Sequence, residues 1–173
     1  MIDIVSYTGK IVFEPPDLTK KHKKQSDWKK VAFVEFDSEI CELYSWFIRR
    51  RYNLVLKKSI RLPHVTIIND SIRDLTKDGI IAIDDVNNLW ETAKEKWNGK
   101  EIELQINVDV RTNGKIWWME LSEESENNLQ NIRNELNLKS PYFSFHLTIG
   151  SAHPKYEEHS IYIYDLVNYQ STA

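Results

Sequence analysis

The chain has 173 residues, 41% of them hydrophobic and 12% aromatic, which suits a single folded domain and excludes disorder over most of its length. No stretch reaches the roughly 18 apolar residues of a membrane-spanning helix, and residues 1–4 lack the basic and apolar segments that begin a signal peptide. With Cys41 as its single cysteine, the sequence predicts a soluble protein of a reducing compartment, the cytoplasm.

The net charge of −3 is unevenly distributed along the chain. Residues 20–61 hold 12 Lys or Arg and 5 Asp or Glu, a net +7, so the remainder carries −10. A basic field of this kind favours a phosphate-bearing ligand, although a solvated loop and the exposed face of a helix would give the same count. The acidic balance of the whole chain argues against a dedicated binder of duplex DNA.

The first part of the chain predicts strands and one helix. Residues 1–14 alternate apolar and polar side chains in places and favour one or two edge strands, which the prolines 15–16 end. Residues 17–28 are polar and basic, as in a surface loop. The apolar run 31–36 is typical of a strand buried on both faces. The apolar spacing within 38–52 indicates a helix.

Asp37 or Ser38 is expected to cap this helix, and a strand over 62–69 follows it. Later elements are expected as a helix at 84–97, a hairpin at 101–121, a helix at 122–137, and strands at 143–151 and 161–166. The hairpin prediction comes from strict apolar–polar alternation before Asn113-Gly114, a strong two-residue turn. Ser122 is the expected cap of the last helix.

The order of the predicted elements repeats. Each unit is a strand, a helix and a second strand, at 31–36, 38–52 and 63–68 in the first unit, and at 115–121, 122–137 and 145–150 in the second. The repeat predicts a single domain, 1–173, of two similar lobes, with the first motif lobe at about 29–70 and the second at about 101–166. The last strands of the two units are expected to face one another across a cleft.

These last strands carry the same short pattern, which reads Pro63-His64-Val65-Thr66-Ile67 in the first and Phe145-His146-Leu147-Thr148-Ile149 in the second. Side chains at i and i+2 of a strand point to the same face, so each strand would present an imidazole and a hydroxyl together and bury its aliphatic residues. The alternative is two unrelated histidines with hydrogen-bonded threonine neighbours. The equivalent position of both motifs in successive units weighs against that alternative.

The two motifs resemble those of the two-histidine (2H) phosphoesterases, which carry apolar-His-apolar-Thr/Ser-apolar once in each of two related lobes. The first motif departs from the pattern in having Pro63 in front. The resemblance implies an α+β fold of two pseudo-symmetric lobes whose antiparallel sheets face a central cleft. It also implies cleavage of phosphodiesters without a metal, including 2′,3′-cyclic phosphates and RNA linkages. The flanking residues 68–70 and 149–150 further resemble a phage branch that degrades cyclic-nucleotide signals of bacterial CBASS immunity, which would place the protein in the host cytoplasm.

The residue types suit this chemistry. An in-line attack at phosphorus needs a group that takes a proton from the nucleophile and another that gives one to the leaving oxygen. Imidazole titrates near pH 6.5, so His64 and His146 can do both near neutrality, and the sequence does not say which is the base. Thr66 and Thr148 can donate hydrogen bonds to the phosphoryl oxygens. We predict these four residues to be catalytic.

Five other residues are candidates for substrate contact. The alternation of strand 115–121 turns Trp118 away from its apolar face and toward the cleft. Tyr7 and Tyr142 are possible stacking partners for a base, and Arg61 and Lys115 lie near predicted strand ends where they could meet phosphate. Surface charge or core packing is the alternative for each of them.

A metal site is the competing use of two histidines. The motifs lack a nearby cysteine or a tight cluster of ligands, and Asp70 is the one plausible third ligand, so neither a metal nor another cofactor is expected. The leading hypothesis is a phosphodiesterase acting on cyclic di- or trinucleotide signals, and the runner-up is an enzyme of RNA 3′ ends and 2′,3′-cyclic phosphates. The expected partners are therefore a cyclic nucleotide or short RNA, and no membrane. A nucleotide-binding module without turnover, or an interaction protein using the basic stretch, are the alternatives from other classes.

Overall fold

The computed structural model describes residues 3–16, 29–57, 61–71, 83–141 and 143–152. The elements in chain order are β1 (Ile4–Phe13), β2 (Lys29–Glu35), α2 (Ile40–Tyr52), β3 (Leu56–Lys57), β4 (His64–Ser71), α4 (Ile83–Trp97), β5 (Glu101–Thr112), β6 (Ile116–Leu121), α5 (Glu123–Asn134) and β7 (His146–Ala152). None of these helices is long and apolar enough to cross a membrane. The predicted strand at 161–166 and the predicted loop at 17–28 lie outside the described residues.

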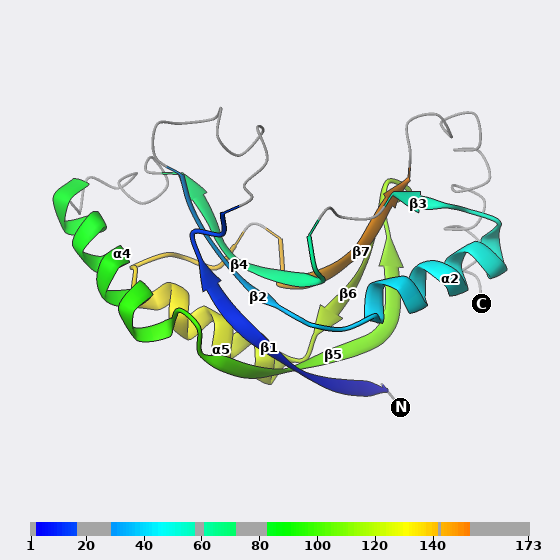
Figure 1. Cartoon of the computed structure of the whole chain (residues 1–173), viewed down its shortest axis with the longest axis horizontal. Coiled ribbons are helices and arrows are strands. Elements are labelled where there is room, and N and C mark those ends of the chain that lie inside the picture. Colours follow the sequence, from blue (N-terminus) through cyan, green and yellow to red (C-terminus); the bar gives the residue numbers. More distant parts are fainter. Residues whose placement is uncertain (1–2, 17–28, 58–60, 72–82, 142, 153–173) are drawn as a thin grey trace.

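The strands of the described ranges belong to one antiparallel sheet, in the order β7-β4-β2-β1-β5-β6, which closes because β6 also pairs with β7. The short β3 attaches to the end of β7. In Figure 1, α2 lies at one end of this closed sheet, and α4 and α5 lie at the other. The α+β class is therefore confirmed, whereas the expected separate facing sheets are in fact one continuous sheet.

The chain builds this sheet from two units of the same order, β1-β2-α2-β4 and β5-β6-α5-β7. Within each unit the first strand pairs with the second, and the second pairs with the last. The units join through β1 with β5 and through β4 with β7. The sequence repeat of strand, helix and strand is thus confirmed, and each unit gains one further strand at its start.

The prediction that residues 1–14 form edge strands is wrong, because β1 pairs with β2 on one side and with β5 on the other. Gly9 explains how β1 fits between its neighbours. A Cβ at this position would stand 2.4 Å from Val34 Cγ1 and 2.9 Å from the Glu35 carbonyl oxygen, so the backbones approach more closely than a side chain would allow.

Local sequence signals set most element ends. Ser122 Oγ accepts a hydrogen bond from the backbone N–H of Ser125, which confirms the predicted cap of α5. Helix α2 begins two residues later than expected, with Glu39 as N-cap, and Ser38 Oγ accepts from the N–H of Ile40. The β5–β6 turn is displaced by one residue, because the N–H of Asn113 bonds to the Ile116 carbonyl and leaves residues 114–115 at the tip.

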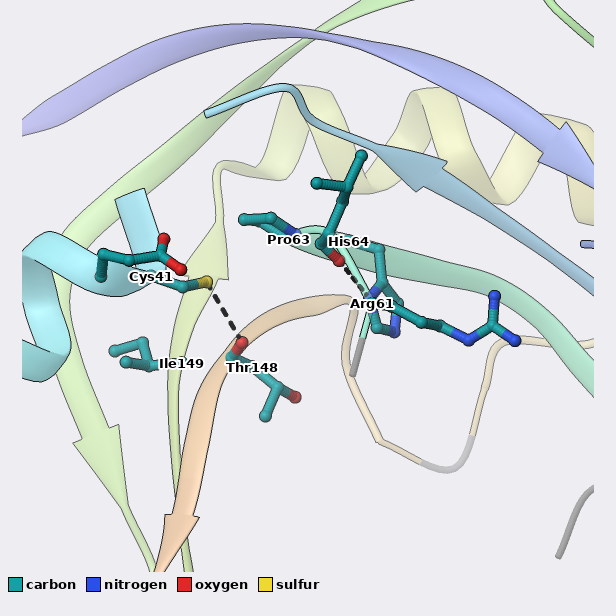
Figure 2. Close-up of a pocket in the computed structure, with 8 residues that line it drawn as sticks. Cys41, Arg61, Pro63, His64, Thr148 and Ile149 are labelled. Atoms are coloured by element: carbon teal, nitrogen blue, oxygen red, sulfur yellow. Dashed lines mark hydrogen bonds between the residues drawn. The ribbon is translucent and has the colours of Figure 1, made fainter. Parts of the chain in front are cut away.

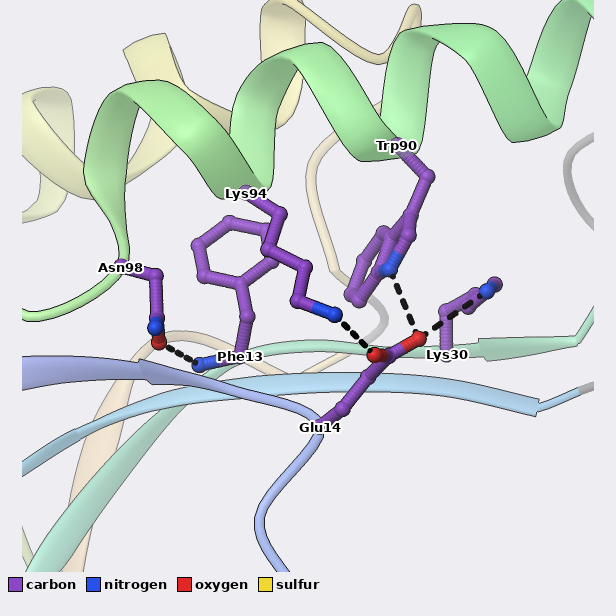
Figure 3. Close-up of polar contacts among 6 residues, drawn as sticks. All are labelled: Phe13, Glu14, Lys30, Trp90, Lys94 and Asn98. Carbon is purple, nitrogen blue, oxygen red and sulfur yellow. Dashed lines mark hydrogen bonds and ion pairs between the residues drawn. The ribbon is translucent and has the colours of Figure 1, made fainter.

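Helix α4 is fastened to the sheet through Glu14, which follows β1 (Figure 3). The Glu14 carboxylate accepts hydrogen bonds from Lys30 Nζ at 3.0 Å, from Trp90 Nε1 at 3.0 Å and from Lys94 Nζ. The Trp90 ring is buried and packs on Phe13 with centroids 4.8 Å apart. Burial raises the pKa of Glu14, but the hydrogen bonds from these three partners and the charge of Lys30 outweigh it and lower the pKa from 4.5 to about 2.

We expect Glu14→Gln to lower the free energy of unfolding by about 1–2 kcal/mol at pH 7, because it removes the charge from this cluster. The pKa shift alone would suggest more, but the Glu14 side chain is 37% exposed and water screens the attraction. A folded-state pKa below the unfolded value of 4.5 stabilises the protein fully above pH 4.5, and this contribution is lost as the pH falls toward 2. Urea denaturation at pH 7 and at about pH 3 measures both effects.

The matched control is Glu103→Gln on the exposed face of β5, which should change the unfolding free energy by less than about 0.5 kcal/mol. Equal losses in the two variants, or a Glu14→Gln defect that does not shrink on acidification, would show that Glu14 does not act as a charged link.

Candidate active site

The two motif strands lie side by side in the closed sheet. Strands β4 and β7 are antiparallel and pair at Val65 and Leu147. In an antiparallel register the residues on either side of this pair stand across from one another, so His64 comes opposite Thr148 and Thr66 comes opposite His146. The imidazole of each motif therefore faces the hydroxyl position of the other motif.

The aliphatic residues of both motifs are buried and the polar ones are accessible. Val65 and Leu147 are each 0% exposed, whereas His64, His146 and Thr148 are half-buried and Thr66 is exposed. This alternation confirms the predicted division of each motif into a core face and an accessible face. It places two imidazoles and two hydroxyls on the same side of the paired strands.

Each histidine is held by the same backbone contact. His64 Nδ1 lies 2.9 Å from the carbonyl oxygen of Leu62, and His146 Nδ1 lies 2.7 Å from that of Ser144. A carbonyl only accepts, so Nδ1 must carry the hydrogen in both rings. The neutral form of each imidazole then has its lone pair on Nε2, and a second proton can be taken up or released there. The backbone contact thus fixes the orientation of both rings and leaves Nε2 as the atom that can exchange a proton.

Each motif also has matched neighbours on the adjoining strand. Glu35 stands opposite His64 and Phe33 opposite Thr66 on β2, and Glu120 stands opposite His146 and Trp118 opposite Thr148 on β6. The underlying sequence pattern is aromatic-apolar-Glu, Phe33-Val34-Glu35 and Trp118-Met119-Glu120. Sequence reasoning missed both glutamates, although this repeated triplet at the end of each strand before a helix is a signal that could have found them.

His64 has an environment of its own. Its ring lies 4.9 Å from the ring of the buried Phe33, and the guanidinium of Arg61 lies 5.4 Å from that phenyl ring. Burial lowers the pKa of His64, and the positive charge of Arg61 and the proximity of His146 lower it further. The hydrogen bond to Leu62 and the charge of Glu35 act in the opposite direction without reversing the shift. His64 is therefore neutral at pH 7.

His146 lies beside Trp118, with the ring centroids 6.3 Å apart in an edge-on arrangement. Trp118 is half-buried, while the residues before and after it, Trp117 and Met119, are buried. The structure thus confirms that Trp118 is oriented toward the motif residues. Its part in substrate binding stays a prediction.

A pocket opens where the two motif strands meet, and its lining includes His64 and Thr148 but neither Thr66 nor His146 (Figure 2). Its lining consists of Cys41, Glu42, Arg61, Leu62, Pro63, His64, Thr148 and Ile149. The first turn of α2 forms one wall, where Cys41 Sγ donates to the Thr148 carbonyl oxygen at 3.5 Å. Sequence reasoning found Arg61 here but missed Cys41 and Glu42, because no local pattern says which strand a helix will cover.

Arg133 of α5 links the first motif strand to the segment that precedes the second. This arginine is 3% exposed. It donates from Nη1 to the carbonyl oxygen of Ile67 in β4 at 2.8 Å, and from Nε and Nη2 to that of Lys139, on the segment that leads to β7, at 2.9 and 2.7 Å. One rigid guanidinium therefore spaces the first motif strand from the approach to the second.

Two other predicted contact residues, Tyr7 and Lys115, do not line the pocket. Tyr7 packs edge-on to Phe36, with the ring centroids 6.3 Å apart. Lys115 lies at the β5–β6 turn, where its carbonyl accepts from the N–H of Ala152. That is six residues along β7 from His146, or about 20 Å of strand. Tyr142 and the side chain of Asp70 lie outside the described residues.

No three His, Cys, Asp or Glu side chains within the described ranges gather as the ligands of a metal ion would.

Comparison with known proteins adds nothing to this geometry, since no family model, no curated protein and no solved structure matches the chain. What the site can do must be judged from its own residues.

We expect Arg61→Gln to move the pKa of His64 upward, closer to the ordinary value of 6.5, because the change removes a neighbouring positive charge. Burial remains, so the pKa should stay below 6.5. Long-range proton–nitrogen NMR across a pH titration measures this pKa and also reports whether Nδ1 carries the hydrogen in the neutral ring. Arg111→Gln, an exposed arginine beside Glu120, is the control that should leave His64 unchanged. A neutral His64 protonated on Nε2 would contradict the assigned tautomer.

We expect Arg133→Met to lower the free energy of unfolding by about 2–3 kcal/mol, because it leaves two carbonyl groups without their buried donor. Arg133→Lys should lie between this variant and the wild type, since an ammonium cannot reproduce the planar set of donors. Arg111→Met on the surface should cost little. Denaturant unfolding compares the three, and a Met variant as stable as the wild type would remove Arg133 from its spacing role.

Proposed function

We propose that this protein is a metal-independent phosphodiesterase in which His64 and His146 act as the general base and general acid on a nucleotide phosphodiester. The observation that carries the proposal is the pair of histidines on neighbouring strands, each with Nδ1–H bound to a carbonyl two residues earlier. This arrangement leaves both Nε2 atoms free for proton transfer, as in-line displacement at phosphorus requires.

The two histidines are suited to different roles in proton transfer. His64 has a lowered pKa because of burial and Arg61, so it is neutral at pH 7 and suited to take the proton of the nucleophile. His146 then gives a proton to the leaving oxygen. If the nucleophile is a 2′-hydroxyl of the substrate, the product is a 2′,3′-cyclic phosphate. If it is water, the same groups open such a cyclic phosphate.

The hydroxyls and one cation would stabilise the charge that develops on the phosphoryl oxygens. Thr148 lines the pocket with His64 and Arg61, and Thr66 lies on the same accessible face. A hydroxyl donates one hydrogen bond to a non-bridging oxygen, and a guanidinium adds charge to the contact. Stabilisation by preorganised donors replaces what a metal ion would supply in other phosphodiesterases.

The resemblance of both motifs to those of the 2H phosphoesterases supports the same reaction. The repeated order β1-β2-α2-β4 and β5-β6-α5-β7, with a motif on the last strand of each unit, agrees with that family's plan of two related lobes. A two-lobed 2H fold is accordingly part of the proposal. The narrower expectation of a phage enzyme that degrades cyclic di- or trinucleotide signals rests on the motif flanks.

The alternative from another class is a module that binds nucleotides without turnover, using the histidines as ligand contacts. The two hypotheses differ in what loss of an imidazole does. If the histidines are an acid–base pair, removing one imidazole abolishes turnover and leaves ligand affinity largely unchanged. If the protein only binds nucleotides, the same change lowers ligand affinity, and there is no turnover to measure.

We expect His64→Ala and His146→Ala each to lower turnover by about 10²–10⁴-fold, because each removes one proton-transfer group. Substrate affinity should change far less. The assay offers cyclic dinucleotides, cyclic trinucleotides and an RNA ending in a 2′,3′-cyclic phosphate, with EDTA present throughout. Thr66→Val and Thr148→Val should be slower than the wild type but faster than either histidine variant.

The control is Thr92→Val on the exposed side of α4, which should cleave like the wild type. Turnover that survives the loss of either histidine would refute the paired mechanism. Inhibition by EDTA would refute its independence of metal. Cleavage of none of these substrates, combined with loss of nucleotide binding in both histidine variants, would favour the binding module.

A further inference from the structure

Helix α2 turns a set of large side chains to solvent. The α2 face consists of Leu43, Trp46, Phe47, Arg49 and Arg50, all exposed. Trp46 is 55% exposed, and Leu43 and Phe47 are about half exposed, at 50% and 49%. Hydrophobic groups of this size grouped on one helix face are typical of a surface that meets a ligand.

The α2 face continues directly from the pocket. Glu42 lines the pocket, and Trp46 and Arg50 follow it at intervals of four residues, so the three form one ridge along the helix. From Glu42 to Arg50 the ridge is about 12 Å long, at 1.5 Å per residue. A stacked single strand advances about 3.4 Å per nucleotide. The ridge therefore matches three to four nucleotides beyond the pocket.

The chemistry of the ridge is that of a single-strand platform. The guanidinium of Arg50 lies 5.8 Å from the centroid of the Trp46 ring, and the rings of Trp46 and Phe47 lie 5.2 Å apart. No carboxylate among the described residues pairs with Arg49 or Arg50. Exposed rings offer faces to bases, and cations without an acidic partner are available to phosphates.

We propose that the α2 face is a docking track for a linear single-stranded oligonucleotide whose reacting phosphodiester lies at the two motifs, beside the pocket. The proposal deepens the proposed function and rests on it for the reaction at the motifs. It names the substrate class as linear RNA of at least four nucleotides, since a cyclic dinucleotide in the pocket would leave the track unused. Bases stack on Trp46 and Phe47, and the backbone passes Arg49 and Arg50.

Oligouridylates of two, four, six and eight nucleotides with a 5′ fluorophore test the length dependence. Binding is measured by fluorescence anisotropy with the His146→Ala variant, and cleavage is measured with the wild type in EDTA. Affinity should rise at least tenfold from two to six nucleotides and then level off. Trp46→Ala should reduce the ratio of eight-mer to two-mer affinity at least fivefold.

The double change Arg49→Ala with Arg50→Ala should lower the slope of log Kd against log salt by about 0.7 for each phosphate that the variant no longer binds. Lys100→Ala, an exposed cation before β5, is the control and should bind all lengths like the wild type. Circular dichroism melting confirms that the variants are folded, as expected for exposed residues.

The outcomes separate the two proposals. Cleavage of RNA with no gain in affinity beyond two nucleotides, or a gain that Trp46→Ala leaves intact, overturns the track and leaves the phosphodiesterase standing. Absence of cleavage at every length, with length-dependent binding that needs Trp46, supports the track and refutes the enzyme. Binding of phosphatidylglycerol vesicles through Trp46 without length-dependent RNA binding would assign the face to a membrane surface and overturn the proposal.

Discussion

The pairing of β4 with β7 is the constraint on which the candidate site depends. These strands meet at Val65 and Leu147, and the antiparallel register then decides which residues stand beside that pair. A slip of one residue would turn the imidazoles into the core and the aliphatic side chains into water. Complete burial of both Val65 and Leu147 opposes such a slip. The apolar residues of the motifs thus determine on which side of the sheet the histidines and threonines lie.

The two repeated units are interlocked instead of standing apart. Helix α2 belongs to the first unit but contacts the second motif strand, through Cys41 and the Thr148 carbonyl. Helix α5 belongs to the second unit but contacts the first motif strand, through Arg133 and the Ile67 carbonyl. Each motif is therefore supported by the helix of the other unit. This exchange gives a physical reason why the sheet closes at β4 and β7.

The sequence predicts those features of the fold and of the candidate site that depend on residues close together in the chain. The alternation of accessible His146 with buried Leu147 follows from the two-residue period of a strand, and the cap at Ser122 follows from a local hydrogen bond. The central position of β1, the closure of the sheet and the contact of Cys41 with β7 depend on long-range pairing, which no local pattern encodes. The repeated motifs indicated a shared site because the repetition itself carries long-range information.

The two histidines make the same backbone contact but have different side chains around them. Both donate Nδ1–H to the carbonyl two residues earlier, and both face a glutamate on the adjoining strand. His64, however, packs on the buried Phe33 near Arg61, whereas His146 meets the edge of the half-buried Trp118. Acid–base catalysis needs groups in opposite protonation states at one pH. The repeated units therefore supply two imidazoles with equivalent backbone contacts, and their different neighbours are what would distinguish base from acid in the proposed reaction.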